Sequence, residues 1–351
     1  MIVLGALSSP ISGFRVDSYK PHIHTPVPMA GKVSPDDLCE FVFGRTGATD
    51  DVVVQGPAYG EDAAAIEWPG GQLVVSSDPI SLASSQVGTL AVHVACNDVA
   101  ASGADPRWLT TVIMLPDGAD LETITRDLDA AARDVGAAIV GGHSEYVDAL
   151  SRPLLSLTAM GATDRFVPTG GAEPGDRILL TKAAGIEGTA VLAADFGADL
   201  DVDDDVLDRA TGFLAEISVV PDARVVREYA TAMHDPTEGG VLAGALELAR
   251  ASDVTLAIDR ESVPVREETR TLCAAAGVDP LRIFGSGALL ATVPRATVGD
   301  CLEALADEGI EAAEIGEVQG GDGGLKLDGE TITGPVEDDL YSLWEAADAE
   351  S

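Results

Sequence analysis

The sequence predicts two consecutive α/β units in one chain of 351 residues. Three observations support this: the length, the alternation of short β-type runs with helical patterns, and a Gly/Pro-rich segment near the middle. At about 100–200 residues per domain, the length suits two domains with a large buried core. The segment TDRFVPTGGAEPGD at 163–176 marks the boundary between the two units.

The first unit should start with a helix, since Ser34 can cap it and Pro35 suits its first turn. The segment 121–135 is an amphipathic helix, because apolar residues recur on one face: Leu121, Ile124, Leu128, Ala131, Ala132 and Val135. An apolar helix is expected at 87–102. Strands are expected at 51–55, 63–68, 72–77, 108–115, 138–141 (buried) and 154–162.

The second unit should contain strands and helices in alternation. Strands are expected near 178–181, 254–258, 288–293 and 312–318, and helices include 240–250 and 266–276. The acidic run DVDDD at 201–205 is expected to be a solvated loop, because the spacing of a calcium-binding EF-hand is missing.

These elements give a predicted domain organisation. Residues 1–28 are expected to be a disordered or non-native extension, with Met29 as the natural start. The first domain would span 29–163, a linker 164–176, the second domain 177–335 and an acidic tail 336–351.

The charge is strongly negative: 59 acidic and 21 basic residues give a net charge of −38. Nucleic acids and anionic membrane surfaces are therefore excluded as partners, because both attract Lys/Arg patches. The acids are scattered and only four lysines occur, a pattern that resembles proteins of salt-accumulating halophilic archaea. We expect stability to depend on salt.

The remaining composition indicates a folded protein of the cytoplasm. A hydrophobic fraction of 46% argues against disorder, and no run of about 18 apolar residues predicts a membrane span. Four scattered cysteines suit a reducing compartment, with Cys96 expected in the core. Phosphate-loop, Gly-x-Ser-x-Gly and His-Glu-x-x-His motifs are missing from the sequence.

Five polar clusters interrupt apolar context at the ends of expected elements: Gly60–Asp62, Ser76–Asp78, Asn97–Asp98, Gly141–Glu145 and His234–Gly240. Singly, each has an ordinary alternative, since Asp62 and Asp78 could be turn or cap residues and His143 a structural hydrogen-bonding residue.

Asn97 and Asp98 are harder to explain structurally, because short polar side chains inside an apolar helix need partners. Oxygen ligands of this kind suit Mg²⁺, which commonly bridges carboxylates to substrate phosphates.

In this order, the clusters resemble the PurM-like ATP-binding superfamily of AIR synthase-related proteins. Within that superfamily they are most similar to the branch of the hydrogenase maturation factor HypE. The motifs that carry the resemblance are GPAYGEDAAAI, SSDPI, HVACNDVAASGADPRW, GGHSE, TGGAEPGDRILLTK, IEGTA, HDPTEGG and SGALL, which lie between Gly56 and Leu290.

The resemblance implies a PurM-like fold of α/β (α+β) class, with two domains. The N-terminal sheets of a homodimer would pair into a barrel, and ATP and Mg²⁺ would bind in the cleft between the domains. It assigns Mg²⁺ to Asp62, Asp78, Asp98 and Glu145. It assigns the nucleotide to Asn97, Gly141, Gly142, His143 and Lys182, and the reacting end to Asp235, Glu238 and His143.

The implied activity is ATP-dependent activation of an amide or carbonyl oxygen in a small-molecule or carried substrate. HypE proteins carry their carbamoyl group on a C-terminal cysteine, whereas this sequence ends in AES and its last cysteine is Cys301, within an expected helix. A role in hydrogenase maturation with a partner protein therefore stays open. The alternatives are a small-molecule kinase resembling thiamine-monophosphate kinase and a non-catalytic nucleotide-binding dimer.

Overall fold

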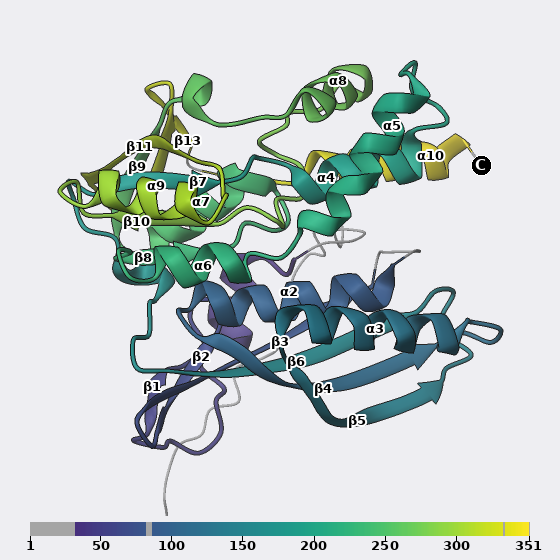
Figure 1. Cartoon of the computed structure of the whole chain (residues 1–351), viewed down its shortest axis with the longest axis horizontal. Helices are drawn as coiled ribbons and strands as arrows, with labels where there is room; N and C mark the ends of the chain where they lie inside the picture. The colour runs from purple at the N-terminus through teal and green to yellow at the C-terminus, as the bar shows by residue number, and fades with distance from the viewer. Residues whose placement is uncertain (1–31, 82–85, 333, 351) are drawn as a thin grey trace, which may run out of the picture. The chain divides into compact units, whose positions relative to one another are not determined.

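The N-terminal half of the protein is a mixed sheet with two long helices packed on one face (Figure 1). The computed structural model describes residues 32–81, 86–332 and 334–350. The expected extension 1–28 and start at Met29 lie outside the described residues. The six strands have the order β1-β2-β3-β6-β4-β5, in which β4 and β5 are parallel.

The strands of this sheet are β1 (Val53–Gln55), β2 (Ala64–Trp68), β3 (Gly71–Ile80), β4 (Asp105–Leu115), β5 (Ala138–Tyr146) and β6 (Leu154–Thr163). A short helix, α1 (Pro35–Asp37), and a π-helical turn, η1 (Leu38–Val42), precede them.

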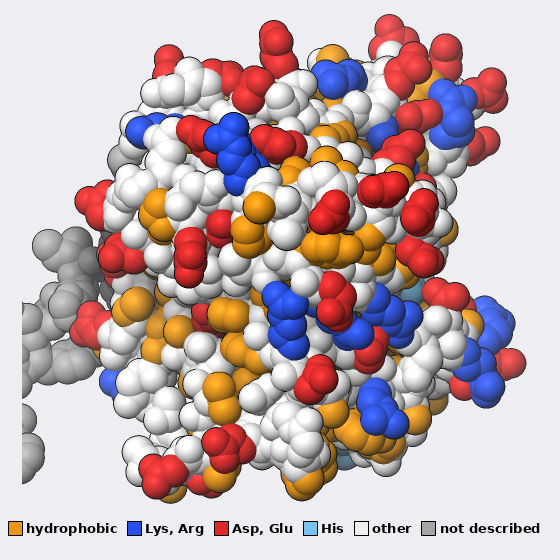
Figure 2. Space-filling view, turned by 60° about the vertical axis from the view of Figure 1, so that its left-hand side comes forward, with side chains coloured by type: hydrophobic (Ala, Val, Ile, Leu, Met, Phe, Trp, Pro, Cys, Tyr) orange, Lys and Arg blue, Asp and Glu red, His pale blue; other side chains and the backbone are white. Residues whose placement is uncertain are grey.

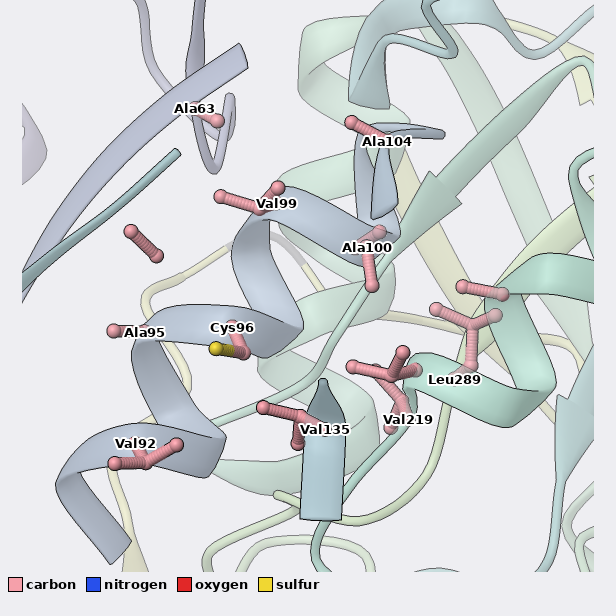
Figure 3. Close-up of a cluster of buried hydrophobic side chains, with 14 of the residues drawn as sticks. Ala63, Val92, Ala95, Cys96, Val99, Ala100, Ala104, Val135, Val219 and Leu289 are labelled. Carbon is pink, nitrogen blue, oxygen red and sulfur yellow. The ribbon is translucent and has the colours of Figure 1, made fainter. Parts of the chain in front are cut away.

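The helices on the sheet differ in character. Helix α3 (Leu121–Val135) is amphipathic, and its buried residues are five of the six expected, Ile124, Leu128, Ala131, Ala132 and Val135. Helix α2 (Val87–Ala101) is buried nearly all round, because it lies between the sheet and the C-terminal half. Figure 3 shows Cys96 of α2 among apolar side chains from both halves, so its expected place in the core is confirmed.

One strand differs from expectation. The segment 138–141 was predicted as a buried strand, but β5 runs to Tyr146 and is exposed along its whole length. The physical reason is position: β5 is the last strand of the sheet, so only β4 pairs with it. Val140 is consequently 57% exposed despite its apolar side chain.

The C-terminal half is built on a seven-stranded sheet with the order β13-β12-β9-β11-β7-β10-β8. Its strands are β7 (Arg177–Thr181), β8 (Ala232–His234), β9 (Val254–Ile258), β10 (Leu290–Val293), β11 (Ala312–Gly320), β12 (Gly324–Leu327) and β13 (Glu330–Ile332). No strand from this sheet joins the first one, so the described residues form two separate sheets and no closed barrel.

The α-helices of this half are α4 (Ile186–Val191), α5 (Asp204–Thr211), α6 (Val220–Val226), α7 (Gly240–Ala251), α8 (Glu267–Ala276), α9 (Val298–Asp307) and α10 (Asp339–Glu350). Short 3-10 or π turns are η2 (Thr169–Gly171), η3 (Leu192–Phe196), η4 (Gly212–Glu216) and η5 (Arg260–Ser262). Among the described helices, none is long and apolar enough to cross a membrane.

Two acidic segments of this half are helical. Asp204 and Asp205, from the run expected to be a loop, are solvated but form the first turn of α5. The expected acidic tail contains α10, whose Leu340 is fully buried. Tyr341 and Trp344 of the same helix pack against Phe284. Elsewhere the acids are scattered: on the face drawn in Figure 2, Asp and Glu side chains lie among Lys/Arg, apolar and other side chains.

Candidate active site

The proposed site is built around a buried aspartate on helix α2. Asp98 is 7% exposed and accepts a hydrogen bond from the hydroxyl of Ser76 on β3. Burial raises the pKa of Asp98 well above its usual range, and the neighbouring charges of Asp78, Asp235 and Asp62 raise it further. The negative charges of these three carboxylates therefore disfavour the ionised form of Asp98.

The four aspartates, Asp62, Asp78, Asp98 and Asp235, are named the carboxylate cluster below. Asp78 lies on β3 and Asp98 on α2, whereas Asp62 lies in the loop before β2 and Asp235 in the loop directly after β8. Burial raises the pKa of Asp78 and, strongly, that of Asp235, and Asp62 adds to both increases. The fold thus concentrates negative charge where water is excluded.

Asp235 is the least satisfied member of the cluster. It is 2% exposed, and neither of its carboxylate oxygens has a hydrogen-bond partner in the described part of the chain. A buried carboxylate without partners is strongly destabilising, and native proteins keep one chiefly where a cation or substrate completes it. The Asp235 carboxylate is therefore an acceptor that a positive ligand would satisfy.

A histidine lies between the cluster and helix α7. His234 is 4% exposed, with Nδ1 2.8 Å from an Asp62 carboxylate oxygen and Nε2 3.0 Å from Glu247 Oε2. Burial would lower the pKa of His234, but Asp62 and Glu247 outweigh it and raise that pKa well above its usual range. Despite burial, Lys32 and His234 lower the pKa of Glu247 to about 2.

The sequence analysis assigned no role to His234, Glu247 or Lys32. Glu247 does have a local signal, because it is the one acid within the otherwise apolar run of α7. Its Oε1 lies 3.3 Å from Lys32 Nζ, and the backbone N–H of Lys32 donates to Glu238. Nothing in the local sequence indicates that residue 32 would meet residue 247.

The glutamate that precedes Asp62 has a structural role. Glu61 accepts hydrogen bonds from the backbone N–H groups of Thr169 and Gly170 at 3.1 and 3.0 Å. Both of its oxygens are therefore used to fasten the linker helix η2 to the first domain.

Asn97, expected near the nucleotide, is fully buried between the two halves. Its Nδ2 donates to the carbonyl of Ile217, and its Oδ1 accepts from the N–H of Val219, both at 2.9 Å. The amide thus joins α2 to the segment before α6.

Lys182, also expected near the nucleotide, holds the same segment. Its ammonium donates to the carbonyls of Glu216 and Ser218 and lies 3.1 Å from Asp222. Burial is the main cause that lowers the pKa of Lys182. The structure therefore places Asn97 and Lys182 together, at the junction of the two halves.

The Gly-Gly-His-Ser-Glu motif lies on the exposed edge strand β5. His143 Nε2 is 3.6 Å from Glu145 Oε2, and the two side chains are 66% and 52% exposed. Gly141 and Gly142 pair with Thr110 and Thr111 of β4. The structure brings Asp62, Asp78 and Asp98 together, but Glu145 faces His143 on this strand.

Glu238 belongs to a second group of acids at the start of α7. Asp338 accepts hydrogen bonds from the N–H groups of Gly239 and Leu340, at 2.8 and 3.0 Å. Burial, with Glu238 and Glu187 nearby, raises the pKa of Asp338 to about 7. The segment before α10 therefore caps the loop that carries Asp235 and Glu238.

The carboxylate cluster offers oxygen donors of the kind that Mg²⁺ prefers. In the described ranges, no three His, Cys, Asp or Glu side chains converge as a preformed metal cage. However, Mg²⁺ usually keeps waters and is held by one or two carboxylates plus substrate phosphates, so a complete cage is not required. The oxygen-only donor set and the unpartnered carboxylate of Asp235 fit such an ion.

Comparison with known families agrees with this two-domain fold. The AIR synthase related protein N-terminal domain matches residues 60–163, and the C-terminal domain of the same family matches 173–328. The fold and site thus define a two-domain AIR synthase-related protein. The chain belongs to the AIR synthase related family and is an ATP-dependent enzyme of that family.

Individual relatives are HypE proteins. Carbamoyl dehydratase HypE of Azotobacter vinelandii is 35% identical over 277 residues, covering 73% of this chain and 78% of that protein. The structure of a HypE–HypF complex matches with a TM-score of 0.66 and 25% identity, over 78% and 92% of the two chains. HypE in complex with ATP matches in fold, with a TM-score of 0.62 and 23% identity, over 88% and 97%.

Proposed function

We propose that this enzyme uses Mg²⁺-ATP to activate an amide or carbonyl oxygen by phosphoryl transfer. The observation that carries the proposal is the carboxylate cluster, in which Asp235 has no hydrogen-bond partner among the described residues. The solved complex of HypE with ATP supports the choice of nucleotide. The name of the A. vinelandii relative, carbamoyl dehydratase, supports the choice of an amide.

The carboxylate cluster would hold the metal. Asp62, Asp78, Asp98 and Asp235 are the residues that we assign to it, and a bound Mg²⁺ would neutralise charge on the phosphates. His234 and Lys32 are the cations whose charges act on these carboxylates. A divalent ion would favour the ionised forms of these aspartates, whose pKa values burial raises, and would offset their negative charge.

The residues of the His234–Gly240 loop would act on the substrate. Once phosphorylated, the amide oxygen leaves as phosphate, and the amide nitrogen must lose its protons to a nearby base. Glu238 is the candidate base, since it is a carboxylate on the loop that follows β8 and is not assigned to the metal. His143 would act with it only if β5 is brought to the site.

A second copy of the chain would bring β5 there. The edge strand has unpaired backbone groups and exposed apolar side chains, which is a template for strand pairing. Pairing along this edge would bury Gly141, Gly142, His143 and Glu145 at a dimer interface. We propose that the homodimer and its shared barrel form in this way, with the nucleotide near the interface.

The amide is proposed to be carried by another molecule. Burial raises the pKa values of Cys96 and Cys273 to about 12 and that of Cys301 to about 11. Such buried thiols hold almost no thiolate at neutral pH and are poor carriers of a carbamoyl group, whereas the fourth cysteine, Cys39, is exposed on η1, far from the C-terminus in sequence. The HypE–HypF complex supports a maturation protein as the partner.

The test is ATP turnover at about 3 M KCl, where surface acids are screened. Phosphate release is measured with the wild-type protein, Asp62→Ala and Asp98→Ala, in the presence of carbamoyl-bearing acceptors. We expect release by the wild type and loss in both variants; undiminished release would remove the proposed metal site. Stable phosphate on an acceptor would identify a kinase instead, and tight ATP binding without turnover would identify a binding protein.

A further inference from the structure

A chain of contacts leads from the buried carboxylate cluster to Lys32, the first described residue of the protein, whose side chain is 49% exposed. His234 lies between Asp62 and Glu247, with one ring nitrogen close to each carboxylate, at 2.8 and 3.0 Å. Glu247 continues the chain, with its second oxygen 3.3 Å from Lys32 Nζ. Asp62, His234, Glu247 and Lys32 are named the charge chain below.

The backbone around the charge chain is packed closely. Gly60, two residues before Asp62, has a φ of +81°, and a Cβ there would lie 2.9 Å from the carbonyl oxygen of Glu247. The loop that carries Asp62 is therefore pressed against α7 at Glu247. A glycine is required there both by the left-handed backbone and by the space.

Each member of the charge chain restricts the orientation of the next side chain. A carboxylate accepts hydrogen bonds but cannot donate them, so His234 can satisfy both neighbours only by pointing a nitrogen at each. Rotation of the ring would break two contacts at once inside a site with little water. Glu247 thus fixes the orientation of the ring, and the ring holds the Asp62 carboxylate, both of whose oxygens lie 2.8 Å from Nδ1.

We propose that Glu247 is a positioning residue, which orients Asp62 toward the metal through His234. This inference rests on the proposed function, because it takes Asp62 to be a metal ligand. Lys32 is the outer member of the charge chain and holds Glu247 from the other side. Outer residues that orient metal ligands typically change metal affinity by about 10–100-fold when they are replaced.

The test measures binding of Mn²⁺ alone, as a probe for Mg²⁺, to the full-length protein without nucleotide. Glu247→Gln keeps the shape of the side chain and removes its charge. We expect the Mn²⁺ dissociation constant to rise by about 10–100-fold, with cooperative unfolding retained. Glu247→Asp keeps the charge, and it should recover part of the affinity.

The matched control is Asp279→Asn, which breaks an ion pair with Arg260 of 2.8 Å in the same half of the chain. It should lower the melting temperature but change the Mn²⁺ dissociation constant by less than about twofold. If Glu247→Gln does not fold, Lys32→Met removes the outer member instead, and a weakening of several-fold is expected.

The outcomes separate this inference from the proposed function. Wild-type Mn²⁺ affinity in Glu247→Gln, or in Lys32→Met where that substitute is used, would overturn the positioning role. If affinity is nevertheless lost in Asp98→Ala, the metal site and the proposed function stand. Failure of the wild-type protein to bind Mn²⁺ both alone and in the presence of ATP would overturn both.

Discussion

The side-chain oxygen of Asn97 accepts a hydrogen bond of 2.9 Å from the backbone N–H of Val219, across the junction of the two halves. Asn97 is the only asparagine in the chain, and it is fully buried. Because the same amide also donates to Ile217, one side chain satisfies two backbone groups that water does not reach. Its position on α2 places this contact next to Asp98.

Replacement of Asn97 by Ala should therefore destabilise the whole protein. Two buried backbone groups lose their partners, and each costs about 1–3 kcal/mol. We expect the free energy of unfolding to fall by about 2–5 kcal/mol in denaturant titrations. Gln55→Ala is the control, since that amide donates only to the carbonyl of its neighbour Gly56. Equal stability of the two variants would show that the contact contributes nothing.

The Asp338 carboxyl should make stability depend on pH. Its pKa is about 7 in the folded protein, against an ordinary value of 3.8, so the folded state binds more protons between these values. Stability contributed by this group is therefore present at pH 4 and is lost as the pH rises to about 7. The loss is on the order of a few kcal/mol at most.

Asp338→Asn should remove this pH dependence, because Asn does not titrate. The measurement is the free energy of unfolding of both proteins between about pH 4 and 8 at fixed salt. The other titratable groups contribute equally to both proteins, so the difference between the two free energies of unfolding reports on Asp338 alone. That difference should shift in favour of the variant as the pH rises. A constant difference across that range would show that Asp338 keeps an ordinary pKa.

Strand β5 offers a test of the proposed dimer. Val140→Lys places a charge on the exposed edge strand, where Val140 is 57% exposed. We expect sedimentation to show a dimer for the wild type and a monomer for this variant. The control is Val54→Lys on β1, at the opposite edge of the sheet, where Val54 is 50% exposed. A Val140→Lys dimer as stable as the wild type would rule out this edge as the interface.

Salt should stabilise the protein, because its net charge is −38. The Debye length falls from about 10 Å at 0.1 M to about 3 Å at 1 M, which screens repulsion among surface carboxylates. The melting temperature should therefore rise with KCl between about 0.1 and 3 M. Replacing the exposed Asp201, Asp203 and Asp205 by Asn should reduce the slope. A melting temperature indifferent to KCl would contradict this account.

Periodic elements could be predicted from the sequence. Helix α3 begins at Leu121 and ends at Val135 as expected, because an amphipathic pattern of 3.6 residues depends on local spacing alone. Strand β5 could not be predicted correctly, because the apolar run Ile139–Val140 reads the same whether a strand lies inside a sheet or at its edge. The position of a strand in a sheet depends on distant residues.

The candidate site, too, could be predicted only where it depends on local sequence motifs. Asp62, Asp78, Asp98 and Asp235 stand in recognisable motifs, and the fold brings them together. The charge chain was not predicted, because two of its contacts join residues 172 and 215 positions apart in the sequence.

The central claim is that the carboxylate cluster holds a divalent cation for ATP, and Asp235→Asn tests it most directly. Neither carboxylate oxygen of Asp235 has a partner among the described residues, so removing its charge should leave the melting temperature equal or higher. The measurement is calorimetric binding of ATP with and without Mg²⁺, beside the melting temperature. We predict Mg²⁺-dependent ATP binding by the wild type, lost by at least about tenfold in a stable Asp235→Asn. Unchanged Mg²⁺-dependent binding in that variant would contradict the account.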